Sequence, residues 1–65
     1  MSYEEILKVL KNNDSVTVDV GDDDLCFSRR VNNLWGRKIW GVWAYLTDEE
    51  LAEELIEDYT VEFIY

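Results

Sequence analysis

This chain of 65 residues contains no histidine and no proline, and its one cysteine is Cys26. A lone cysteine cannot close an internal disulfide, and without histidine the chain lacks the ligands of an ordinary zinc site. Two common supports of very small domains are therefore missing. The nine aromatic residues are the available replacement, because each can bury about 150 to 250 Å² on folding.

Long apolar runs are missing as well. The longest apolar stretch without a charge, residues 39–46, is too short to cross a bilayer. The N-terminal residues show neither the basic nor the apolar region of a signal peptide. These absences predict a cytoplasmic protein that has no membrane partner.

No set of residues points to catalysis. The chain has no glycine-rich phosphate loop, and Cys26 has no sequence partner that would activate its thiol. Its fifteen acidic residues offer many carboxylate pairs, but none stands out as an acid and base. Asp22, Asp23 and Asp24 lack the alternate spacing of a calcium loop. We therefore expect a protein that is not an enzyme and holds no metal or cofactor.

Charge is divided along the chain into three blocks. Residues 1–24 carry two bases and seven acids, a net of −5, whereas residues 25–47 carry four bases and no acid. Residues 48–65 carry eight acids and no base, which brings the total to −9. Such a charge repels nucleic acid and anionic membranes and favours encounter with a basic protein.

The first half of the chain begins with a helix signal. Ser2 and Glu5 have the spacing of a capping box, which predicts a helix from Tyr3 to Asn12-Asn13. Residues 15–20 then alternate valines with polar residues, and this period of two predicts a strand.

A second strand is predicted over residues 25–31, after an acidic turn. Asn32-Asn33 predicts a two-residue turn, because asparagine is the non-glycine residue that best tolerates positive φ. Gly36, a few residues further on, is interpreted as the site of a bulge.

Residues 37–46 predict one central strand, because nearly every position is apolar, aromatic or β-branched. One alternating set is Ile39, Gly41, Trp43 and Tyr45, and the other is Trp40, Val42, Ala44 and Leu46. Both faces of this strand require cover. We expect at least one of Trp40 and Trp43 in the core, and the pattern leaves open which is exposed.

The last third of the chain starts with a second capping box at Thr47 and Glu50, which predicts a helix. A final strand is predicted over residues 60–65, with Val61, Phe63 and Tyr65 on one side. The predicted fold is a single α+β domain over residues 1–65, in the order α-β-β-β-α-β. Two short helices would pack on a mostly antiparallel sheet.

The second predicted helix carries an acidic stripe. Glu50, Glu53, Glu54 and Glu57 lie at i, i+3, i+4 and i+7, opposite the apolar residues of that helix. One interpretation is an ordinary solvated face. The other is a row of carboxylates that replaces nucleic-acid phosphates, since no lysine relieves the repulsion between these neighbours.

The basic block surrounds an aromatic residue. Its four cations and Trp35 have the composition of a surface on which a nucleic-acid base stacks. Alternatively, this basic segment lies against the acidic segments of its own chain, with Trp35 at the edge of the core. The net charge of −9 favours the second interpretation and argues against direct nucleic-acid binding.

In size and composition alone, the chain is similar to phage and mobile-element proteins that inhibit host defence nucleoproteins, such as anti-CRISPR and anti-restriction inhibitors. The resemblance implies a small inhibitor that occupies a basic nucleic-acid-binding surface of another protein by charge mimicry. Its expected contact residues are Glu50, Glu53, Glu54 and Glu57, with Asp22, Asp23 and Asp24 adding to the field. The alternative is a structural or regulatory interaction module that forms a homodimer through an aromatic sheet face including Trp43. A third interpretation is adaptation to a cytoplasm of high salt.

Overall fold

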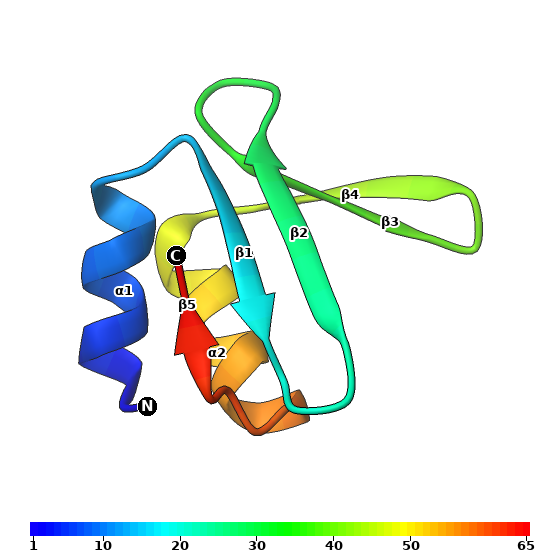
Figure 1. The fold of residues 1–65 in the computed structure, drawn as a ribbon. Helices are drawn as coiled ribbons and strands as arrows, with labels where there is room; N and C mark the ends of the chain where they lie inside the picture. The colour runs from blue at the N-terminus through cyan, green and yellow to red at the C-terminus, as the bar shows by residue number, and fades with distance from the viewer.

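The computed structural model describes residues 1–65, which form two helices and a five-stranded antiparallel sheet (Figure 1). In chain order the elements are α1 (Tyr3–Lys11), β1 (Ser15–Asp19), β2 (Asp24–Arg29), β3 (Trp35–Ile39), β4 (Val42–Leu46), α2 (Asp48–Asp58) and β5 (Phe63–Ile64). The strand order across the sheet is β4-β3-β2-β1-β5. The α+β class, the two helices and the antiparallel sheet are as predicted.

Both predicted capping boxes are present. At α1, the Ser2 hydroxyl accepts from the Glu5 N–H at 3.2 Å, and the Glu5 carboxylate accepts from the Ser2 N–H at 3.1 Å. The Ser2 backbone N–H, followed by its hydroxyl, holds the pKa of the Glu5 carboxyl below its usual value. At α2, Thr47 and Glu50 exchange the same two bonds. Neither helix is long and apolar enough to span a membrane.

One hydrophobic cluster joins the helices to one face of the sheet. Its members are Ile6, Leu10, Val16, Val18, Phe27, Trp35, Leu51, Ala52, Leu55, Val61 and Ile64. Side chains alternate between the two faces of the sheet along β1 and β2. Every second side chain therefore points to the opposite, outer face, which no helix covers. Phe63 and Tyr65 lie exposed on that outer face, with ring centroids 5.6 Å apart.

The prediction of a single central strand over residues 37–46 is wrong. The chain reverses at Trp40 and Gly41, whose φ angles are 53° and 81°, so this stretch forms the β3–β4 hairpin. Two consecutive residues at positive φ make the kind of tight turn whose twist matches antiparallel strands, and glycine takes the second position without strain. β4 consequently lies at the edge of the sheet, and β2 takes the centre.

The sequence predicts at least one of Trp40 and Trp43 in the core, but the tryptophan found there is neither of them. Trp40 is 97% exposed at the tip of the hairpin and Trp43 is partly exposed, whereas Trp35 is fully buried. The indole N–H of Trp35 donates to Asp48 Oδ1 at 2.6 Å, which satisfies its one polar atom. The core therefore takes its tryptophan from the start of the hairpin instead of its middle.

Two smaller predictions require correction. Gly36 forms no bulge, because it pairs in register with Ser28 on one side and Tyr45 on the other. At the C-terminus only Phe63–Ile64 is a strand, and the chain reaches it from α2 through irregular backbone. Val61 is therefore buried together with Ile64, while Phe63 is exposed, so Val61 and Phe63 do not share a face.

Candidate protein-binding surfaces

Arg29 lies at the junction of the helices and the sheet, with its side chain only 14% exposed. Its guanidinium forms an ion pair with Asp48 at 2.9 Å and donates to the Leu10 carbonyl, at the end of α1, at 2.6 Å. It also lies over the Trp35 ring, 4.5 Å from the centroid. This cation therefore holds the molecule together and is not free to meet a ligand.

Arg37, on β3, forms an ion pair with Glu54 of α2. Together with Arg29, it confirms that the basic segment lies against the acidic segment of its own chain. The Arg37–Glu54 ion pair also means that the four glutamates of the predicted acidic stripe are not equivalent. Glu54 is engaged by Arg37 and Glu50 by the capping box, whereas Glu53 and Glu57 are exposed without a basic partner.

The acidic turn between β1 and β2 lies at the same end of the molecule as the last turn of α2 (Figure 1). Two observations agree with this placement: a Cβ on Gly21 would lie 3.7 Å from Glu62 Oε1, and Tyr59 and Asp24 line the same cleft. Asp22, Asp23 and Asp24 are all exposed. The last carboxylates of α2 and those of the acidic turn therefore lie at one end of the molecule and form an acidic surface. Trp43 is not part of this surface.

Trp43 lies on the outer face of the β3–β4 hairpin beside two cations. The Arg30 guanidinium is 4.0 Å from its ring centroid, and Lys38 Nζ is 6.0 Å away. Gly36 makes the first contact possible, since a Cβ there would lie 2.3 Å from Arg30 Cδ. Unlike Arg29 and Arg37, neither Arg30 nor Lys38 has a carboxylate partner.

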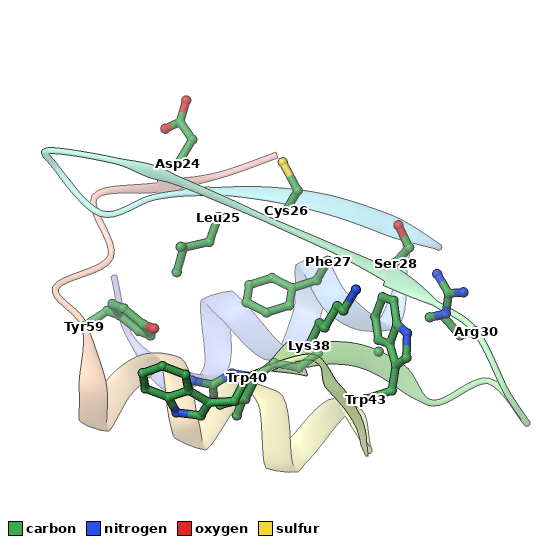
Figure 2. A pocket seen from close by; sticks show the side chains of 13 residues that line it. Asp24, Leu25, Cys26, Phe27, Ser28, Arg30, Lys38, Trp40, Trp43 and Tyr59 are labelled. Carbon is green, nitrogen blue, oxygen red and sulfur yellow. The ribbon is translucent and has the colours of Figure 1, made fainter.

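A cleft of about 580 Å³ opens between β2 and the hairpin, because β2 and β3 pair only at Ser28↔Gly36 and Arg29↔Trp35 and then diverge. Figure 2 shows Leu25 and Phe27 pointing from β2 into this space, with Tyr59 at one end. The lining residues are Asp24, Leu25, Cys26, Phe27, Ser28, Arg30, Gly36, Arg37, Lys38, Ile39, Trp40, Trp43 and Tyr59.

Sequence reasoning missed this cleft, because it treated residues 37–46 as one strand. The available signal was Gly41, between two runs of strand-forming residues of equal length. A hairpin there places Lys38 opposite Trp43, as the observed register does. The basic block then separates into two structural cations, Arg29 and Arg37, and two free ones.

The chain contains no group of three or more cysteine, aspartate or glutamate side chains arranged to hold a metal ion. Cys26 is a free, exposed thiol whose Sγ lies 3.9 Å from the Thr17 hydroxyl. No protein-family model, curated protein or solved structure matches this chain. Function therefore has to be argued from the acidic surface, the outer face and the cleft.

Proposed function

We propose that this protein is a non-enzymatic binding protein that occupies a basic, nucleic-acid-binding surface of another protein with the carboxylates of α2 and the β1–β2 turn. The observation that carries the proposal is the pairing of charges within the chain. Of the eight acids in residues 48–65, only Asp48 and Glu54 form ion pairs with bases. The unpaired carboxylates are therefore available to the cations of a partner protein.

The spacing of these carboxylates supports the same conclusion. Glu49, Glu53 and Glu57 follow one another at intervals of four residues on α2, and all three are exposed. At 1.5 Å per residue they span about 12 Å of helix axis, a length comparable with a few phosphates of a nucleic-acid strand. Glu57 and Asp58 also occupy the last turn, where the helix dipole opposes negative charge.

The test is a charge reversal on this surface. The Glu53→Lys/Glu57→Lys variant, the wild type and a Glu4→Lys control are immobilised and exposed to host lysate at about 50 mM and about 200 mM salt. Bound proteins are then eluted with a double-stranded DNA oligonucleotide and identified by mass spectrometry. Glu4 suits the control because it is an exposed helical glutamate that belongs to α1 and to neither α2 nor the β1–β2 turn.

The proposal expects a basic nucleic-acid-binding protein that DNA elutes from the wild type and the control but that is absent from the double variant. Its capture should fall steeply with salt, because exposed charges separated by more than a Debye length are screened. Capture that the reversal and the DNA both leave unchanged would contradict charge mimicry.

A second candidate function is homodimerisation through the outer sheet face. The observation that favours it is the aromatic surface that no helix covers, with Phe63 and Tyr65 on one side and Trp43 on the other. Dimerisation would appear in sedimentation equilibrium as a mass that rises with protein concentration and that Trp43→Ala lowers. A monomeric mass at every concentration would exclude it.

A further inference from the structure

We propose that the cleft between β2 and the β3–β4 hairpin binds an extended acidic peptide segment of a partner protein, which adds as a strand between the two diverging edges. Apart from Asp24 and Arg37, the partner of Glu54, its lining residues take no part in the proposed acidic surface. The inference therefore goes beyond the proposed function and does not depend on it.

Unused backbone groups on both walls support the proposal. In β2, Arg29 N–H donates to Asp14 O and Asp23 O accepts from Val20 N–H, so these residues turn their backbone toward β1. Because the direction alternates along an antiparallel strand, Cys26 turns its N–H and C=O toward the cleft. Lys38 does the same from β3, two residues beyond Gly36, where the pairing with β2 ends.

An added strand would satisfy these groups. An open strand edge is a template for pairing with another chain, and main-chain hydrogen bonds supply affinity in strand addition. Residues 24–27 offer about 13 Å of edge at about 3.3 Å per residue, which is enough for a four-residue segment. The volume of about 580 Å³ is also in the range of small-ligand sites.

The side chains around the cleft define the chemistry of the segment. Its floor is apolar, formed by Leu25, Phe27 and Tyr59 (Figure 2). Its outer rim carries Arg30 and Lys38, the two cations beside Trp43 that have no carboxylate partner. The one carboxylate of the lining, Asp24, lies at the end away from Arg30 (Figure 2). Since side chains alternate along a strand, the matching segment alternates acidic residues facing the rim with apolar residues facing the floor.

Backbone chemistry and topology distinguish this occupant from two others. A nucleic-acid strand would meet the same cations, but its sugar-phosphate backbone has no row of N–H and C=O groups to pair with Cys26 and Lys38 beyond the last β2–β3 pair. Of the two edge strands that a second copy could offer, β4 carries no acidic residue and β5 is only two residues long, so neither is a strand of alternating acidic and apolar residues. An acidic peptide from another protein satisfies the cations, the floor and the backbone together.

The experiment uses a fluorescein-labelled, capped hexapeptide of sequence Glu-Val-Glu-Val-Glu-Val and measures its affinity for the full chain by fluorescence anisotropy. Amide shifts in ¹H–¹⁵N spectra locate the peptide. We expect the largest shifts at residues 24–27 and 38–39. We also expect about tenfold weaker binding of the Lys-Val-Lys-Val-Lys-Val peptide, and of a Glu-Val peptide methylated on alternate amide nitrogens.

The matched variants are Lys38→Glu and Lys8→Glu. Both lysines are exposed and neither has an ion-pair partner, but Lys8 lies on α1, away from the cleft. Lys38→Glu should weaken the peptide about tenfold or more, whereas Lys8→Glu should change affinity by less than about twofold. Circular dichroism verifies that both variants fold.

Three results would overturn the inference. One is equal affinity for the Glu-Val and Lys-Val peptides, and another is an affinity that Lys38→Glu does not change. The third is a set of shifts at residues 24–27 and 38–39 that changes with protein concentration and not with added peptide, because a second copy would then occupy the cleft. The Glu53→Lys/Glu57→Lys variant should keep full peptide affinity, so failure here and failure of charge mimicry give different patterns.

Discussion

Two neighbouring arginines each lie over a tryptophan ring, with opposite consequences. Arg29 packs 4.5 Å from the centroid of the buried Trp35, and its guanidinium contacts Asp48 and the end of α1. Arg30 packs 4.0 Å from the centroid of Trp43 on the open outer face, without a carboxylate. The alternation of β2 decides the difference, because it turns Arg29 toward the helices and Arg30 away from them.

The comparison shows that the same pair of residue types serves stability in one place and leaves a charge available in another. A buried ion pair becomes costly when one partner is lost, because the other charge stays desolvated. An exposed cation over a ring contributes about 0.5 to 1 kcal/mol and keeps its hydration. Four tests of this division follow, in descending order of expected effect.

The largest loss of stability is expected from replacing Arg29, with the replacement of Arg30 as the matched comparison. Arg29→Ala leaves Asp48 without its cation and the Leu10 carbonyl without its donor, and should lower the free energy of unfolding by about 3 kcal/mol. Arg30→Ala should lower it by less than about 1 kcal/mol. Urea unfolding followed by circular dichroism measures both. Equal losses would abolish the distinction between the two arginines.

The tryptophans should differ in the same direction. Trp35→Phe removes the indole N–H that donates to Asp48 at 2.6 Å and should cost about 2 kcal/mol, because the bond is made to a charged acceptor. Trp43→Phe keeps an aromatic ring beside Arg30 and should cost less than about 0.5 kcal/mol. Thermal unfolding of the two variants makes the comparison. A larger loss at Trp43 would show that the hairpin packs more firmly than its exposure indicates.

Gly36→Ala tests whether the contact between Arg30 and Trp43 depends on the missing side chain. A Cβ would lie 2.3 Å from Arg30 Cδ and 3.2 Å from Trp43 Cζ3, so the arginine has to move. We expect a loss of about 1 kcal/mol, reduced by about half in an Arg30→Ala background. A double-mutant cycle measures this coupling. Additive losses would mean that Arg30 moves aside freely.

The smallest effect on stability is expected at the hairpin tip, and it should be favourable. Trp40 occupies a turn position at φ 53° and is 97% exposed, so Trp40→Asn should stabilise the protein by about 0.5 kcal/mol. Because Trp40 lines the cleft, the same change should also weaken binding of the Glu-Val peptide. Chemical denaturation and peptide anisotropy measure the two effects on one variant. Unchanged peptide affinity would limit the binding surface to Trp43 and its cations.

Local signals predicted most of the fold. The capping boxes at Ser2 and Thr47 and the alternation of β1 depend on residues close in sequence, and all three are confirmed. The turn at Asn32-Asn33 is confirmed as well, with φ angles of 51° and 63°. Each of these features is set by a side chain that bonds or restricts its own neighbouring backbone.

The hairpin was missed because its turn uses Trp40 in place of an asparagine, and a tryptophan inside an apolar run indicates strand. The cleft was missed as a consequence, since it exists only where β2 and β3 diverge after two residue pairs. The different roles of the two arginines could not be predicted from the sequence either. Arg29 and Arg30 are adjacent and identical in type, and only the tertiary packing distinguishes the buried one from the exposed one.

β4 has one further consequence. It closes the sheet with five uncharged residues, and Val42 is 68% exposed. Exposed edges of this kind lack the lysines and prolines that usually discourage fibrils. Repulsion between molecules of charge −9 is then the principal barrier to edge-to-edge growth. Acidification that protonates the carboxylates should therefore promote ordered aggregation, and Ala44→Lys, a charge placed on this edge, should suppress it.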